Sequence, residues 1–214
     1  MNALFHKKVK TLSEITPSFF FIQIGAKGGG WPDPIRRYVL KYNWQGIFVE
    51  PIPYWFKKLK KTYTNALNVS FENVAIAEEN TKRVFYHVRE SNWYLRLIGG
   101  SLSSFSKENI LKHVRWWRPP GLRSNIIEST LNCLSFNTLL QKYGVQKIDL
   151  LVIDTEGYDF KILAQVPFNR IRPSMIYYEH KHLSAEEKTA GEILLKSNGY
   201  QFKNGVRNTF AWTN

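Results

Sequence analysis

Short apolar runs separated by amphipathic stretches recur along this chain, and their alternation predicts a doubly wound α/β domain. The first run, residues 19–24, is apolar apart from Gln23, which is typical of a strand buried on both faces of a parallel sheet. Further strands are expected at residues 47–49, 69–76, 83–88, 101–105, 130–134, 148–153 and 174–178, with a closing antiparallel pair at 200–203 and 209–212. Helices are expected at residues 33–41, 53–65, 107–113, 135–143, 158–163 and 184–197. Such a domain binds ligands where the carboxyl ends of its parallel strands meet.

A glycine-rich turn, G-A-K-G-G-G over residues 25–30, follows the first strand directly. Glycine lets the backbone adopt positive φ and approach a ligand closely, although the same turn could simply join a strand to a helix. The next apolar run ends at Glu50, where a carboxylate can accept both hydroxyl protons of an adenosine ribose. The combination therefore favours a nucleoside-binding site over plain turn chemistry.

The composition is that of one globular domain, which we place at residues 1–214 with residues 1–17 as an N-terminal extension. We find neither an apolar run long enough to span a membrane nor a secretory signal, and we expect a cytoplasmic protein. Cys133 has no partner cysteine and is expected to be a buried thiol without a chemical role. The 30 Lys and Arg against 17 Asp and Glu give a net charge of +13, which attracts polyanions or anionic membranes without naming a partner.

The segment H-V-R-W-W-R-P-P-G, from His113 onward, is unlike the rest of the chain. Trp116 and Trp117 could stack on a planar or sugar substrate, touch a membrane interface, bind single-stranded nucleic acid or pack on the core. The Pro-Pro-Gly that follows indicates an excursion from the fold. We predict that residues 91–129 form an insertion or lid on the substrate side.

Several motifs taken together resemble the FkbM family of S-adenosylmethionine-dependent methyltransferases. They are I-G-A-K-G-G, W-Q-G-I-F-V-E-P-I-P, E-N-V-A-I, I-D-L-L-V-I-D-T-E-G-Y-D and E-H-K-H-L, and the likeness runs from about residue 19 to 212. The resemblance implies a class I methyltransferase, which is Rossmann-like, with a seven-strand, mainly parallel sheet and an antiparallel last strand. It also implies S-adenosylmethionine as the cofactor and methylation of oxygen on sugars or natural products.

The resemblance also assigns roles by position. Gly25, Ala26 and Gly28 would lie against the methionine part of the cofactor and Glu50 would bind its ribose, with Asn73 and Val74 beside the adenine and Asp154 and Glu156 beside the transferred methyl group. The chain departs from its relatives at three positions: many carry an acid in place of Gln23, another residue in place of Thr155, or an acid in place of Asn208.

An alcohol acceptor needs a base or a metal ion to become a better nucleophile. Asp154 and Glu156 follow one core strand, and Glu179, His180 and His182 follow another. In one chemistry a histidine takes the hydroxyl proton while a carboxylate orients it; in the other Asp154, Glu156 and Glu179 hold Mg²⁺. The alternative is structural, because the carboxylates could cap a helix or a turn and the histidines could line a polar edge.

The remaining members of the predicted substrate pocket are Asp33, Ser103, His113, Trp116 and Trp117. The sequence therefore predicts a methyltransferase that acts on a hydroxyl group of a sugar, glycan or small molecule. Two alternatives stay open: a methyltransferase acting on RNA or another polyanion, motivated by the charge, and a basic binding module that has lost catalysis, motivated by Gln23 and Asn208.

Overall fold

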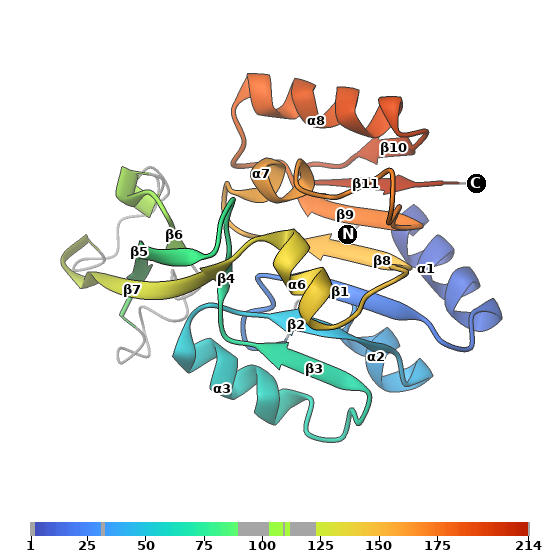
Figure 1. The fold of residues 1–214 in the computed structure, drawn as a ribbon, viewed down its shortest axis with the longest axis horizontal. Helices are drawn as coiled ribbons and strands as arrows, with labels where there is room; N and C mark the ends of the chain where they lie inside the picture. Colours follow the sequence, from blue (N-terminus) through green and yellow to red (C-terminus); the bar gives the residue numbers. More distant parts are fainter. Residues whose placement is uncertain (1–2, 31–32, 90–102, 109, 112–122, 214) are drawn as a thin grey trace.

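A seven-stranded sheet forms the centre of the molecule. The computed structural model describes residues 3–30, 33–89, 103–108, 110–111 and 123–213. The sheet has the order β10-β11-β9-β8-β1-β2-β3 (Figure 1). Its strands are β1 (Phe20–Ile24), β2 (Gln45–Val49), β3 (Val69–Glu72), β8 (Leu150–Ile153), β9 (Met175–Glu179), β10 (Gln201–Asn204) and β11 (Asn208–Trp212). All neighbours pair in parallel except β11, which is antiparallel to both β9 and β10, so the predicted doubly wound sheet with a reversed last strand is confirmed.

Helices cover both faces of this sheet because its central strands carry apolar side chains on both faces. One core joins α1 (Ala3–Ile15), α2 (Arg36–Tyr42) and α3 (Pro53–Thr62) to the face that carries Phe21 and Val152. The other joins α6 (Phe136–Lys142), α7 (Asp159–Leu163) and α8 (Ala185–Ser197) to the face that carries Ile22 and Ile153. None of the helices in the described part of the chain has the length and hydrophobicity of a membrane span.

The helix boundaries follow from capping groups. Ser135 and Ser184 accept hydrogen bonds from the third backbone N–H of α6 and α8, as expected for N-cap residues. The helix expected from residue 33 begins instead at Arg36, because the Asp33 carboxylate accepts hydrogen bonds from the backbone N–H groups of Ile35 and Arg36, each at 2.8 Å. Asp33 therefore holds the first turn of α2.

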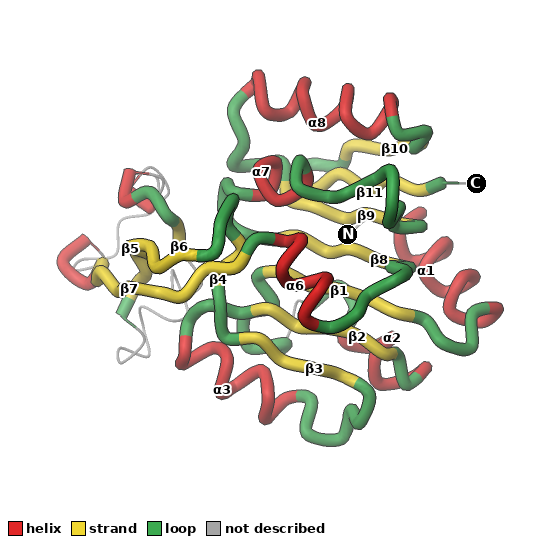
Figure 2. The backbone as a smooth tube through the Cα atoms, in the orientation of Figure 1, coloured by secondary structure: helices red, strands yellow, loops and turns green. Residues whose placement is uncertain are grey.

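A second sheet stands at the carboxyl end of the main strands, on the left of Figures 1 and 2. Its order is β4-β7-β5-β6, with β4 (Ala75–Ile76), β5 (Thr81–Val88), β6 (Ser103–Ser104) and β7 (Ile126–Leu134), and the short helix η1 (Arg123–Asn125) precedes β7. The prediction of a single strand over residues 69–76 was wrong, because the structure has two strands there, β3 and β4. The segment divides at Asn73, whose amide donates to the backbone oxygens of Glu50 and Pro51, and its second half pairs with β7.

The N-terminal helix α1 is part of the core, although the sequence pattern suggested an extension there. Phe5 and Val9 are completely buried. The Phe5 ring lies 4.5 Å from that of Tyr177 on β9 and 5.3 Å from that of Phe210 on β11. Aromatic side chains buried in this way dominate the energy of a core, so α1 stabilises the reversed edge of the sheet.

Phe5→Ala should lower the free energy of unfolding by about 3–5 kcal/mol, because it removes a fully buried ring and leaves a cavity under β9 and β11. The matched control is Ile15→Ala on the same helix, where the side chain is 71% exposed, and it should change stability by less than about 0.5 kcal/mol. Urea denaturation measures both. Equal effects of the two substitutions would show that α1 does not belong to the core.

Candidate active site

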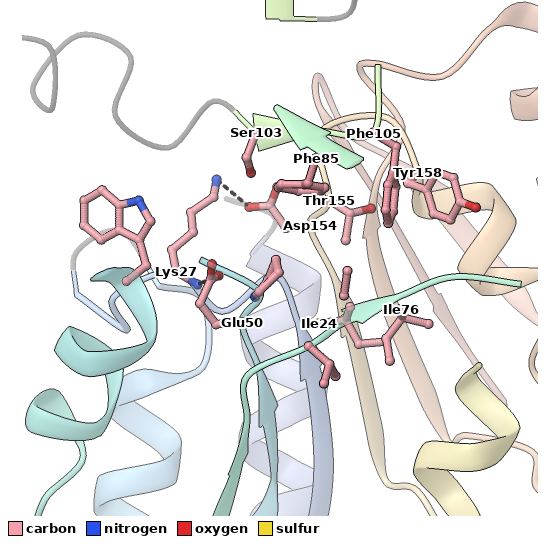
Figure 3. Close-up of a pocket in the computed structure, with 15 residues that line it drawn as sticks. Ile24, Lys27, Glu50, Ile76, Phe85, Ser103, Phe105, Asp154, Thr155 and Tyr158 are labelled. Atoms are coloured by element: carbon pink, nitrogen blue, oxygen red, sulfur yellow. Dashed lines mark hydrogen bonds and ion pairs between the residues drawn. The ribbon is translucent and has the colours of Figure 1, made fainter. Parts of the chain in front are cut away.

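An apolar cavity opens where β1, β2 and β8 end, beneath the second sheet (Figure 3). It encloses about 520 Å³ of unfilled space, including its opening to solvent, which is within the usual size of a small-molecule site. Its walls combine backbone from the strand ends with apolar side chains from β4, β5 and α3. The lining residues that matter below are Gly25, Lys27, Glu50, Trp55, Val74, Ile76, Phe85, Ser103, Phe105, Asp154 and Tyr158.

Gly25 brings the end of β1 against the end of β8. Its φ is +79°, and a Cβ atom built there would lie 1.9 Å from the backbone oxygen of Asp154. No side chain fits that space. The glycine predicted from the sequence is therefore required by close packing of two chain segments at the floor of the cavity.

Glu50 ends β2 as a buried carboxylate held in a fixed orientation. Its Oε2 accepts the backbone N–H of Lys27 at 2.7 Å and its Oε1 accepts that of Ile52 at 2.9 Å. Burial raises the pKa of Glu50 to about 7, although these two hydrogen bonds oppose the shift. Each oxygen retains a lone pair for a ligand hydroxyl, which is the geometry that a ribose-binding carboxylate needs.

Lys27 is the main functional candidate that the sequence reasoning missed. Its ammonium lies 3.4 Å from Asp154 Oδ2 and 3.1 Å from Glu156 Oε1, and Figure 3 shows it reaching across the cavity toward Asp154. Burial alone would lower the pKa of Lys27, but the carboxylates of Asp154 and Glu156 outweigh it and the net shift is upward. The two carboxylates therefore favour the charged form of Lys27. The place of this residue in the middle of the glycine turn was the signal available in the sequence.

The loop D-T-E-G after β8 is built around Asp159. This fully buried carboxylate accepts hydrogen bonds from the backbone N–H and hydroxyl of Thr155 and from the backbone N–H of Gly157 and Glu179. Burial, with Asp154 nearby, raises its pKa to about 8. Glu156 adopts φ of +55°, a left-handed conformation that is uncommon outside glycine. The Asp159 network thus holds Glu156 in an unusual orientation toward the neighbouring strand.

Glu156 meets Glu179 and His182 at the ends of β8 and β9. The Nε2 atom of His182 lies 3.3 Å from Glu156 Oε2 and 3.4 Å from Glu179 Oε2. Burial raises the pKa of Glu179 to about 7, with Glu156 and Asp154 adding to the shift and Arg207 opposing it. Glu156, Glu179 and His182, which the sequence predicted as catalytic or metal-binding residues, thus lie together. Asp154, a fourth predicted residue, is joined to them by the ammonium of Lys27.

Other predicted site residues lie elsewhere. His180 bonds the hydroxyl of Thr209 at 2.9 Å, and burial together with Lys188 of α8 lowers its pKa, so it stands apart from the carboxylates. Asp33 caps α2, and the exposed Asn73 is engaged by backbone oxygens while its neighbour Val74 lines the cavity. The predicted His113, Trp116 and Trp117 lie outside the described residues.

The glycine loop borders the floor of the cavity. Gly25 lines it directly, and Ala26 is buried behind it. Gly28 packs against the Lys58 side chain, and its backbone oxygen accepts a hydrogen bond from Thr62 at 2.8 Å. This loop therefore joins the cavity floor to helix α3.

A second, polar groove borders the cavity and shares the rings of Phe105 and Tyr158 with it. It encloses about 970 Å³ with its opening, and hydroxyl and charged groups line it: Arg83, Ser104, Ser106, Lys161, His182, Ser184 and Glu187. Tyr158 donates a hydrogen bond to Glu78, and Arg83 donates to both residues, which anchors β5 to the loop after β8. His182 connects this groove to the carboxylate cluster.

Comparison with known proteins identifies the family. A model of the methyltransferase FkbM domain matches residues 23–202, which is most of the chain. The chain belongs to the FkbM methyltransferase family. The match supports a methyltransferase domain in residues 23–202 and S-adenosylmethionine as its methyl donor. No curated protein matches the sequence.

Solved structures share the class I methyltransferase fold. The FkbM methyltransferase from Methylobacillus flagellatus KT matches with a TM-score of 0.57 at 10% identity, over 92% of this chain and 44% of that one. The N-terminal domain of human METTL16, solved in complex with SAH, matches with a TM-score of 0.50 at 11% identity, over 98% and 68%. This chain spans less than half of the M. flagellatus protein.

Gly25→Ala should disrupt the site, because the added Cβ would meet the Asp154 backbone and φ is positive. We expect a loss of more than about 2 kcal/mol in unfolding free energy and no detectable binding of S-adenosylhomocysteine by calorimetry. Gly144→Ala is the control, since its φ is +59° but no atom lies within 4 Å of the new Cβ, and it should cost about 1 kcal/mol with binding retained. Retained binding in Gly25→Ala would contradict the packing argument.

Proposed function

We propose that this FkbM methyltransferase transfers a methyl group from S-adenosylmethionine to a hydroxyl of a sugar, glycan or small-molecule acceptor. One observation carries the proposal: an apolar cavity that contains an oriented carboxylate, Glu50, lies next to a polar groove. Acidic side chains lie where the cavity and the groove meet. The cavity suits a nucleoside, and the groove suits an acceptor with several hydroxyl groups.

The cavity fits the cofactor by its own chemistry. Glu50 would accept the ribose hydroxyls, Val74, Ile76 and Phe85 would contact the adenine, and Gly25 would border the methionine part. S-adenosylmethionine supplies an electrophilic methyl group on a sulfonium centre. The chain therefore has to place an acceptor hydroxyl in line with that group and receive its proton.

The residues at the junction of the two cavities are suited to those tasks. The Phe105 and Tyr158 rings, 4.8 Å apart, offer an apolar surface on which a sugar ring can lie. Asp154 lines the cavity, while Glu156 contacts His182, which lines the groove. We assign uptake of the hydroxyl proton to this cluster, and Lys27 keeps Asp154 and Glu156 oriented for it.

A polyanionic acceptor is the second candidate. Trp55 of α3 lines the cavity, and the same helix carries four exposed lysines, namely Lys57, Lys58, Lys60 and Lys61. A basic face beside the cavity would attract an RNA or an acidic glycan. Cytoplasmic residence stays a prediction.

Cofactor affinity should depend on pH through Glu50. A ribose hydroxyl donates to the ionised carboxylate, so binding favours the charged form, and affinity should fall as pH drops through the raised pKa of about 7. With that value, the Kd of S-adenosylhomocysteine should rise about tenfold between pH 8 and pH 6. Glu50→Gln should bind weakly at both pH values and lose most of this slope. A wild-type Kd that does not change with pH would contradict the assignment.

Methyl transfer tests the proposal directly. We expect labelled methyl to appear on a hydroxyl acceptor from a panel of sugars and nucleotide sugars, and Asp154→Asn to lower kcat/KM at least about 100-fold. Glu192→Gln, which removes a carboxylate from α8 away from the site, should leave it unchanged. Methylation of RNA alone, with a steep dependence on salt, would establish the polyanion reading instead.

A further inference from the structure

Three donor atoms from two strand ends converge beside the groove. They belong to Glu156, Glu179 and His182. Among the described residues, this is the one group of three or more His, Cys, Asp or Glu side chains whose donor atoms lie within 4.8 Å of one another. The predicted Mg²⁺ set contained Asp154 instead of His182, but the Oδ2 of Asp154 faces the ammonium of Lys27. The candidate set in the structure therefore contains the imidazole of His182 in place of the carboxylate of Asp154.

The distances within the group match those around a metal ion. His182 Nε2 lies 3.3 Å from Glu156 Oε2 and 3.4 Å from Glu179 Oε2. Good N–H···O hydrogen bonds span about 2.7–3.2 Å. Two ligands bound about 2.0–2.1 Å from a tetrahedral ion lie about 3.3–3.4 Å apart. The spacing is therefore wide for hydrogen bonds and suitable for shared coordination.

Glu179 gives an independent indication of a missing partner. Its side chain is 3% exposed, and Oε2 is buried without a hydrogen-bond partner while pointing toward His182. A buried carboxylate oxygen in that state is costly unless a cation completes its environment. Its other oxygen accepts from Arg207 Nε at 3.1 Å and Nη2 at 2.8 Å, so the carboxylate cannot turn away freely.

The second carboxylate is held in the same way. Lys27 Nζ lies 3.1 Å from Glu156 Oε1, which leaves Oε2 directed at His182. Outer contacts that fix one oxygen of a ligating carboxylate are typical of metal sites, where they orient the ligand. Each carboxylate therefore has one oxygen paired with a cationic side chain and the other directed at His182.

We propose that Glu156, Glu179 and His182 form a binding site for a first-row transition-metal dication, with Zn²⁺ as the best match. Two carboxylates and one imidazole suit Zn²⁺ and its neighbours, whereas Mg²⁺ prefers six oxygen ligands in an octahedron. Three protein ligands with one open position are typical of catalytic zinc. His182 also lines the acceptor groove, so a hydroxyl bound there is within reach of the site.

The role of the ion rests on the proposed function. A divalent ion beside the acceptor lowers the pKa of a hydroxyl and so assists loss of its proton. The existence of the metal site does not depend on that role. Metal binding and S-adenosylhomocysteine binding can therefore be measured separately.

Calorimetric titration of the full chain, first stripped with a chelator, tests the site with ZnCl₂ and MgCl₂ as probes. We expect one Zn²⁺ per chain, no comparable Mg²⁺ binding, and an affinity for Zn²⁺ lowered at least about 100-fold by His182→Gln or Glu179→Gln. His180→Gln is the matched control, because this nearby histidine bonds Thr209 instead, and it should keep wild-type affinity. Bound Co²⁺ should show the intense visible absorption of a four-coordinate ion.

Unchanged Zn²⁺ affinity in His182→Gln, or no Zn²⁺ binding by the wild-type chain, would overturn the proposal. Thermal melts identify any variant that fails to fold. In that case the Co²⁺ spectrum of the wild-type chain tests the metal site without the variant. A spectrum typical of octahedral Co²⁺ would count against the site. S-adenosylhomocysteine binding without Zn²⁺ binding would overturn only this inference. Zn²⁺ binding without S-adenosylhomocysteine binding would overturn only the proposed function.

Discussion

The ammonium of Lys27 is the contact on which the site depends. It neutralises Asp154 and Glu156 at the end of β8, while the backbone N–H of the same residue holds Glu50 at the end of β2. Carboxylates this close together would repel one another and favour protonation without such a cation. Lys27 and Glu156 both adopt positive φ, at +52° and +55°, a conformation that these surrounding contacts maintain. One residue thus connects the carboxylate at the end of β2 to those that follow β8, through its backbone and its side chain.

The second sheet supplies what a bare class I fold lacks. By pairing β4 with β7 it carries Phe85, Ser103 and Phe105 over the carboxyl ends of the main strands (Figures 2 and 3). The bonds among Glu78, Arg83 and Tyr158 attach it to the loop that follows β8. The cofactor cavity and the polar groove are consequently two sides of one wall. The choice of acceptor can therefore depend on the second sheet, whereas the proposed cofactor contacts depend mainly on the seven-stranded sheet.

The fold was largely predictable because its central strands are short, apolar and regularly separated by amphipathic helices. Failures came where local pattern and tertiary pairing disagree. Residues 69–76 look like one strand, yet Asn73 bonds the end of β2 and redirects the chain into another sheet. The first helix carries aromatic residues among lysines, and only its packing against Tyr177 and Phe210 shows that it belongs to the core.

The sequence by itself determined the fold class, the glycine that must end β1, and the acidic residues that end β2 and β8, because strand ends and turns carry local chemical patterns. Tertiary structure decided which of these side chains meet. It brought Lys27 to Asp154, joined His182 rather than His180 to the carboxylates, and assigned Asp33 to a helix cap. Residues two apart on a chain leaving a strand point in directions that only the surrounding packing fixes, so no local pattern could separate the two histidines.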